Sequence, residues 1–197
     1  MRLVLASRNY HKARELGAIL ASWDVLPLET DADPPEETGS TFLENARLKA
    51  RFGRDHVVRV DWVCGEDSGL VVDGLGGEPD IRSARFAGED ATDAENLDLL
   101  LARLDGIAGD GRRARYVCEL VALGPDGREV SARGTLEGRI ATEARGSEGF
   151  GYDPVFVPDG EKQTVAELGD AWKSESSHRA RAARALADAL SLPRGLK

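Results

Sequence analysis

The sequence has few cysteines and no long apolar run, and both shortages limit what the chain can be. Only Cys64 and Cys118 are present among 197 residues, and they show no metal-ligand spacing. We interpret them as small buried residues in a reducing compartment. No apolar run approaches membrane-spanning length, and the run before Arg8 is too short for the core of a signal peptide. We therefore expect a cytoplasmic protein with no membrane partner.

The chain is also short of positive charge, with 26 Lys and Arg against 35 Asp and Glu and a net charge of −9. Binding to a nucleic-acid polymer relies on a cationic surface, so we do not expect such a partner. A small anion would need a local cluster of Lys and Arg that overrides the negative field. The sequence contains neither GxxxxGK[ST] nor GxGxxG, which excludes a Walker loop and a dinucleotide fingerprint.

What is present favours a globular α/β protein, since 41% of the residues are hydrophobic and 31% are charged. The length suits a single domain over residues 1–197, or two small lobes that share a sheet. Predicted strands alternate with helices early and a hairpin follows, which favours a mixed sheet. We predict strands at Arg2–Ala6, Asp24–Leu28, Val57–Cys64, Leu70–Val72, Arg115–Leu123 and Glu129–Ala141, and helices after Asn9, Thr41, Thr92 and His178.

The first predicted strand leads through Ser7 and Asn9 into a helix, and this arrangement suits an anion. Free backbone N–H groups and the positive end of the helix dipole favour phosphate, and Lys12 lies within reach. The alternative is that Asn9 only caps the helix and that Lys12 is solvated. The sequence leaves both interpretations open.

The acidic stretch Gly65–Leu70 separates two apolar runs and places Glu66, Asp67 and Ser68 where we expect the strand to be interrupted. Loops at strand ends often carry catalytic groups, although a tight turn with solvated carboxylates is the common alternative. The pair Glu36–Glu37 raises the same choice, between a solvated acidic loop and a metal ligand.

Two further stretches carry chemistry-bearing residues near the C-terminal end. The glycine-rich loop Gly146–Asp153 holds Phe150 and Tyr152, whose rings are suited either to stack on a planar ligand or to plug the edge of the core. His178 and Arg179 start a helix, where cations are unfavourable, which favours a function. Arg179, with the arginines after it, is alternatively part of an exposed face.

Taken together in order, these motifs resemble the inosine triphosphate pyrophosphatase family, also called Ham1-like, over nearly the whole length. The family's S/T-x-N-x-x-K corresponds to Ser7–Lys12, E-x-x-G-x-T-F-x-E-N-A to Glu36–Ala46 and D-D-S-G-L to Glu66–Leu70. The motifs F-G-Y-D-P, K and S-H-R correspond to Phe150–Pro154, Lys173 and Ser177–Arg179. Single motifs of this kind are weak, but their order along one chain is specific.

Two positions depart from the family pattern. Glu66 stands where the first aspartate of D-D-S-G is usual, which keeps the charge and lengthens the arm. Asp80 stands where glycine is usual, which bears on the local loop conformation.

The resemblance implies a Mg²⁺-dependent hydrolase that cleaves inosine, deoxyinosine and xanthosine triphosphates between the α and β phosphates, releasing pyrophosphate. It also implies an elongated mixed sheet with helices on both faces, two lobes with a central substrate cleft, and a homodimer. Maf-type pyrophosphatases, which act on other nucleotides, and a catalytically inactive nucleotide-binding module are the alternatives.

By resemblance, Asp67 is the catalytic base, and Glu36 and Asp67 are the metal ligands, with Glu37 a substitute for Glu36. The implied substrate-binding residues are Ser7, Arg8, Asn9, Tyr10, His11, Lys12, Lys49, Ser68, Phe150, Gly151, Tyr152, Asp153, Lys173, His178 and Arg179. Among them, Phe150 and Tyr152 are expected to flank the base.

Overall fold

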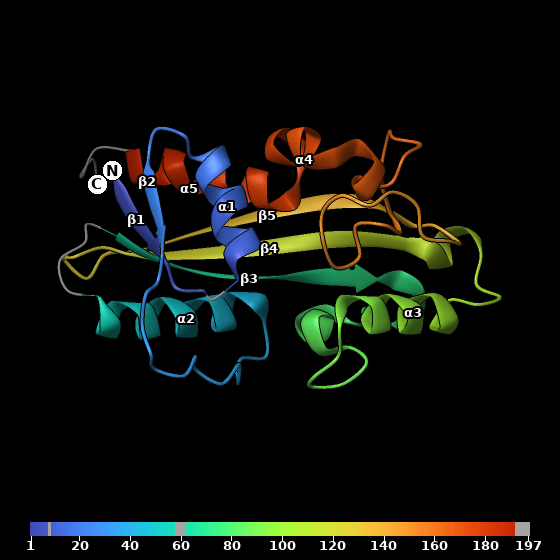
Figure 1. Cartoon of the computed structure of the whole chain (residues 1–197), viewed down its shortest axis with the longest axis horizontal. Helices are drawn as coiled ribbons and strands as arrows, with labels where there is room; N and C mark the ends of the chain where they lie inside the picture. The colour runs from blue at the N-terminus through green and yellow to red at the C-terminus, as the bar shows by residue number, and fades with distance from the viewer. Residues whose placement is uncertain (8, 58–61, 192–197) are drawn as a thin grey trace, which may run out of the picture. The chain divides into compact units, whose positions relative to one another are not determined.

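The computed structural model describes residues 1–7, 9–57 and 62–191. Its described strands form one six-stranded sheet in the order β2-β1-β3-β4-β5-β6. They are β1 (Arg2–Leu5), β2 (Asp24–Pro27), β3 (Trp62–Val72), β4 (Arg113–Leu123), β5 (Glu129–Ile140) and β6 (Phe156–Pro158) (Figure 1). Strand β1 pairs in parallel with β2 and β3, whereas β5 and β6 pair antiparallel. The predicted α/β class and mixed sheet are confirmed.

Four of the five described α-helices lie close to the predicted positions, and α4 (Val165–Ser176) was not predicted. The others are α1 (Tyr10–Ile19), α2 (Phe42–His56), α3 (Asp93–Arg103) and α5 (His178–Ser191), with short 3₁₀ helices at Asp73–Leu75, Asp80–Arg85 and Gly109–Arg112. Asn9 caps α1, and Thr92 with Glu95 forms the predicted capping box of α3. Thr41 also caps α2, but Glu44 accepts hydrogen bonds from Ser40 rather than closing the predicted box. No helix in the described part of the chain is long and apolar enough to cross a membrane.

The chain divides into two compact units whose boundaries fall within β3, β4 and β5 and at the start of α5. Unit 1 comprises residues 1–67, 118–134 and 179–197, and unit 2 comprises residues 68–117 and 135–178. Each unit has its own apolar core.

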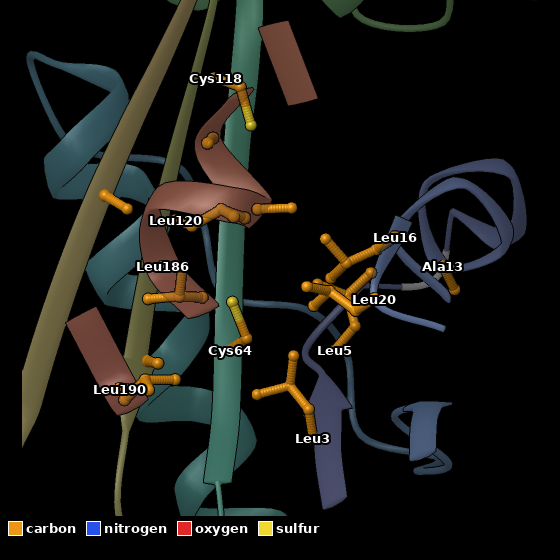
Figure 2. Close-up of a cluster of buried hydrophobic side chains, with 14 residues drawn as sticks. Leu3, Leu5, Ala13, Leu16, Leu20, Cys64, Cys118, Leu120, Leu186 and Leu190 are labelled. Carbon is orange, nitrogen blue, oxygen red and sulfur yellow. The ribbon is translucent and has the colours of Figure 1, made fainter. Parts of the chain in front are cut away.

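The core of unit 1 packs α1 and α5 against β1, β3 and β4. Leu3, Leu16, Cys64 and Leu186 are among its buried members (Figure 2). Both cysteines lie in this unit, free and fully buried, as predicted. On the other face, Ala46 and Ala50 of α2 pack against Val121. Helices therefore cover both faces of the unit 1 strands (Figure 1).

The core of unit 2 packs α3 and α4 against the remaining strand segments. Leu97 and Leu100 of α3 and its C-cap residue Leu104 share this core with Tyr116 of β4 and Phe156 of β6. Asp80, at the position where the family pattern has glycine, has a φ of 51°, in the left-handed region that favours glycine. The departure at this position is thus accommodated by an aspartate held in a glycine-like conformation.

One predicted feature of the sheet is wrong. We expected Gly65–Leu70 to interrupt a strand, but β3 runs through it from Trp62 to Val72. The side chains of Glu66 and Asp67 find cationic partners on neighbouring helices, so tertiary contacts outweigh their low strand propensity. Residues 58–61 of the predicted strand Val57–Cys64 lie outside the described residues.

Candidate active site

Strand β3 turns its two adjacent acids to opposite faces, because side chains alternate along a strand. Asp67 meets α2, where Asn45 Nδ2 donates to Asp67 Oδ2 at 3.3 Å and Lys49 Nζ lies 2.7 Å from Asp67 Oδ1. Glu66 meets α1 and α5, where Lys12 and Arg179 contact its carboxylate. The strand thus places two neighbouring carboxylates on opposite faces, each beside a cation.

Gly65 makes the approach of α2 possible. A Cβ atom at this position would lie 1.9 Å from Ala46 O and 2.5 Å from Ala50 N. Only glycine lets the helix backbone come this near to β3. The residue before the two acids therefore sets the position of Asn45 and Lys49 against Asp67.

A second carboxylate shares Lys49 with Asp67. Lys49 Nζ lies 2.6 Å from Glu37 Oε1 and 2.7 Å from Asp67 Oδ1. Glu36, in contrast, is exposed. The geometry favours Glu37, the substitute that the sequence left open, as the acid that accompanies Asp67.

Burial and charge act on this group in opposite directions. Burial raises the pKa of Asp67, and the nearby ammonium groups of Lys49 and Lys12 oppose that rise. Burial alone would lower the pKa of Lys49, but the carboxylates of Asp67 and Glu37 outweigh it and raise that pKa. A buried carboxylate held this way is a stronger base than a solvated aspartate.

The opposite face holds a closed set of ion pairs. Lys12 Nζ lies 2.6 Å from Glu66 Oε2, and Arg179 Nη2 lies 3.1 Å from Glu66 Oε1. Arg179 also pairs with Glu15 of α1. Glu66 and Arg179 are 1–2% exposed, and these charges keep the pKa of Arg179 above its usual value despite burial. The suggestion that Arg179 belongs to an exposed face is wrong, although Arg181 and Arg184 are exposed.

The turn before α1 has the predicted form for the residues that the structure describes. Asn9 Oδ1 accepts from Lys12 N at 3.2 Å, and Asn9 N donates to Ser7 Oγ at 3.1 Å. Tyr10 is 72% exposed and His11 is also exposed. Arg8 lies outside the described residues. Asn9 caps the helix as the alternative proposed, while Lys12 is ion-paired rather than solvated.

Unit 2 brings Phe150, Asp153 and Lys173 together at a buried ion pair. Lys173 Nζ lies 2.8 Å from Asp153 Oδ2, and the same oxygen accepts from Phe150 N at 3.0 Å. The ammonium of Lys173 also lies 4.6 Å from the centre of the Phe150 ring. Gly151 N donates to Asp93, and Ser68 is half-buried at the start of this unit. Phe150 is half-buried.

Tyr152 does not join this cluster through its side chain. Its ring is 5% exposed within the unit 2 core, and its hydroxyl donates to Ser83 O at 2.8 Å. Burial raises the pKa of its hydroxyl. Of the two interpretations of the loop aromatics, burial in the core is the one that describes Tyr152.

Sequence reasoning missed Tyr116, Glu15 and Asn45. Tyr116 bonds Asp153, Glu15 pairs with Arg179, and Asn45 bonds Asp67. Asn45 stands inside the quoted E-N-A motif, which was the available signal. Tyr116 and Glu15 lie in a strand and a helix whose patterns gave no sign of a site.

Comparison with known proteins decides the family. The sequence pattern of the Ham1 family matches residues 3–189. This chain belongs to the Ham1 family. A dITP/XTP pyrophosphatase of Exiguobacterium sibiricum is 45% identical over 194 residues, covering 96% of this chain and 97% of that protein. One from Escherichia coli (strain K12) is 44% identical, with 96% and 98% covered.

Solved Ham1 structures share the fold. The Staphylococcus aureus Ham1 protein superposes with a TM-score of 0.83 at 39% identity, covering 96% of this chain and 98% of that one. A HAM1 protein from Coxiella burnetii gives a TM-score of 0.85 at 35% identity, covering 97% and 98%. The Ham1 fold thus extends over nearly the whole chain.

The residues present fit the divalent metal that the family resemblance implies. Among residues 1–7, 9–57 and 62–191, no three His, Cys, Asp or Glu side chains form a metal-binding group. Mg²⁺ in nucleotide enzymes is commonly held by only one or two carboxylates together with substrate phosphates. Asp67 and Glu37, which share a single lysine, supply that donor set.

Proposed function

We propose that this chain is a dITP/XTP pyrophosphatase that hydrolyses ITP, dITP and XTP to the monophosphate and pyrophosphate. Full-length similarity to dITP/XTP pyrophosphatases at 43–45% identity supports the reaction. The assignment of the reaction to a site rests on the surroundings of Asp67. This residue is only 5% exposed, and its carboxylate contacts Lys49 and Asn45. Glu37 contacts the same lysine.

Asp67 acts as the general base. The oxygen of a water molecule attacks the α-phosphorus, the bond to the bridging oxygen breaks, and pyrophosphate leaves. The water's proton passes to a carboxylate oxygen of Asp67, whose basicity is increased by burial. Lys49 and Asn45 keep that carboxylate in a fixed orientation.

Mg²⁺, bound by Asp67 and Glu37, would neutralise phosphate charge and lower the pKa of a bound water. Lys12 and Lys49 add positive charge, and the α1 N-terminus with Ser7 and Asn9 offers hydrogen-bond donors to phosphate oxygens. These residues form the local cationic cluster that an acidic protein needs to bind a triphosphate.

The base is recognised in unit 2. Phe150 offers a ring face for stacking, and the ion pair of Asp153 and Lys173 lies beside it. With His178, which is also buried, these two residues are the polar group of unit 2. Arg179, whose guanidinium is a donor at any relevant pH, remains a candidate for the oxygen at position 6 of hypoxanthine and xanthine. We also propose a substrate cleft between two lobes, a homodimer and a cytoplasmic location, on the family resemblance.

A pyrophosphate-release assay tests this function across ITP, dITP, XTP, ATP, GTP and pyrimidine triphosphates. With Mg²⁺ we expect turnover of the first three and little of the others, and EDTA should abolish it. Binding of ITP without release of pyrophosphate would indicate a regulatory module. A preference for pyrimidine triphosphates would indicate Maf-like specificity.

A further inference from the structure

Tyr116 of β4 is a buried residue that no motif includes, and its hydroxyl contacts the polar group of unit 2. The residue is 7% exposed, and its Oη donates to Asp153 Oδ1 at 3.2 Å. The other carboxylate oxygen, Asp153 Oδ2, receives Lys173 Nζ at 2.8 Å and Phe150 N at 3.0 Å. Donors therefore hold both oxygens of Asp153, and the tyrosine hydroxyl acts on the one that Lys173 does not.

The Asp153 carboxylate in turn organises the Phe150 loop. It accepts from the backbone of Phe150 and anchors Lys173, whose ammonium lies 4.6 Å from the centre of the Phe150 ring. Gly149, with a φ of 81°, would bring a Cβ atom within 2.2 Å of Asp153 Oδ2. The loop is thus closed tightly around this carboxylate, and a rotation of the carboxylate would displace Phe150.

The ring of Tyr116 supports a second residue of the group. It stacks on the His178 ring with centroids 4.6 Å apart and an interplanar angle of 13°. It also contacts Phe156 of the core, with centroids 4.5 Å apart. Tyr116 therefore joins the apolar core of unit 2 to both Asp153 and His178, which lie far from it in the sequence.

A core position alone does not require the hydroxyl. A phenylalanine would keep most of the packing, whereas a buried hydroxyl is unfavourable unless it is bonded. In a buried polar network, each bond fixes its neighbours, so losing one donor changes the orientation of the rest. Base recognition depends on such orientation, and small displacements of positioning groups weaken it strongly.

We propose that Tyr116 is a positioning residue for base recognition: its hydroxyl orients Asp153, and through it Phe150, while its ring backs His178. This inference rests on the proposed function, because it assigns Tyr116 to the recognition of the purine base.

The test is Tyr116→Phe, which removes only the hydroxyl. We expect the KM for ITP to rise about tenfold with kcat changed less than about threefold, as for a lost binding contribution. The kcat/KM for ATP should fall less, so the ratio between the two nucleotides narrows. In an Asp153→Asn background, Tyr116→Phe should add less than about twofold, because the hydroxyl acts through Asp153.

Tyr152→Phe is the matched control. It removes another buried tyrosine hydroxyl from unit 2, one that donates to a backbone carbonyl. We expect a similar fall in Tm from both variants, with the ITP to ATP ratio reduced only in Tyr116→Phe. Equal fractional losses for both nucleotides in Tyr116→Phe, or additive losses with Asp153→Asn, would overturn the role of Tyr116 alone. A wild-type protein without ITP turnover would overturn the proposed function as well.

Discussion

Glu66 and Asp67 are neighbours in β3, yet their carboxylates meet different partners on the two faces of the strand. On the α1 and α5 face, Glu66 meets Lys12 and Arg179, and Arg179 also meets Glu15. The buried carboxylate of Glu66 thus has two cationic partners, and the buried guanidinium of Arg179 has two carboxylate partners. Such a set stabilises the fold only as long as it stays complete.

The α2 face instead holds two carboxylates on a shared cation, since Asp67 and Glu37 both contact Lys49. A pair of carboxylates suits a divalent cation, and burial of Asp67 favours proton uptake. We therefore expect the α1 and α5 face to support the site and the α2 face to take part in the reaction.

The largest expected effect comes from a substitution on the α2 face. Asp67→Asn should lower kcat for ITP by about 10²–10⁴-fold, because the amide cannot accept the water's proton. Its thermal stability should stay close to that of the wild type, since Lys49 keeps Glu37 as a partner. Pyrophosphate release and a thermal melt check both statements. Retention of half the wild-type turnover would refute the role of Asp67.

A substitution on the α1 and α5 face should instead lower the stability of the fold. Arg179→Ala leaves Glu66 and Glu15 without this shared cation and should lower the free energy of unfolding by about 3–5 kcal/mol. Arg181→Ala, at an exposed position of the same helix, is the control and should change it by less than about 0.5 kcal/mol. Chemical denaturation measures both variants. If Arg179→Ala unfolds like the wild type and loses only the preference for ITP over ATP, Arg179 contacts the base.

A smaller effect is expected at Lys12, the residue of the α1 and α5 face that we propose to bind phosphate. Lys12→Ala should raise the KM for ITP about tenfold, the size expected for one lost charge-assisted contact. Glu66 keeps Arg179 as a partner, so the protein should remain folded. Added salt should narrow the difference from the wild type, because salt screens charge interactions. Arg14→Ala, at an exposed position of α1, is the control, and an equal KM in both variants would assign Lys12 to structure.

The sequence predicted the elements better than the direction of individual side chains. Asn9 and Thr92 could be predicted as helix caps because capping depends on residues that are close in the sequence. Thr164 with Glu167 forms an equivalent capping box for α4, and that helix was missed although the pattern was present. The continuity of β3 through Glu66 could not be predicted from the sequence. It depends on Lys12 and Arg179, which lie on helices far from β3 along the chain.

The candidate site shows the same limit. Motif resemblance brought together Lys49 and Asp67, and Asp153 and Lys173, which the structure places in contact. It did not distinguish Glu37 from Glu36, since adjacent loop residues differ only in the direction in which the backbone turns them. Nor did it show that Tyr152 of the motif would be buried in the core, or that Tyr116, a strand residue outside every motif, would donate a hydrogen bond to Asp153.

The smallest expected effect concerns Glu119, a third acid on the α2 face, and the pH dependence of stability that it causes. Glu119 of β4 lies on the same face as Val121, its side chain is 10% exposed, and its partner Arg133 is 3.6 Å away and 59% exposed. Burial raises the pKa of Glu119, with Arg133 opposing the rise. A raised folded-state pKa means that the group favours folding below its unfolded pKa, and that this contribution is lost as pH rises through the folded pKa.

Glu119→Gln should therefore be more stable than the wild type at pH 8, by less than about 1 kcal/mol because the exposed ion pair is weak. The advantage should shrink as the pH falls towards about 4, where the wild-type carboxyl also becomes neutral. Thermal melts at pH 8 and pH 4 measure the difference. Glu129→Gln removes a carboxylate whose side chain is 34% exposed and pairs with Arg47, and it should give no gain at pH 8. A gain for Glu119→Gln that persists at pH 4 would come from packing, and a loss at pH 8 would mean that Arg133 balances this carboxylate.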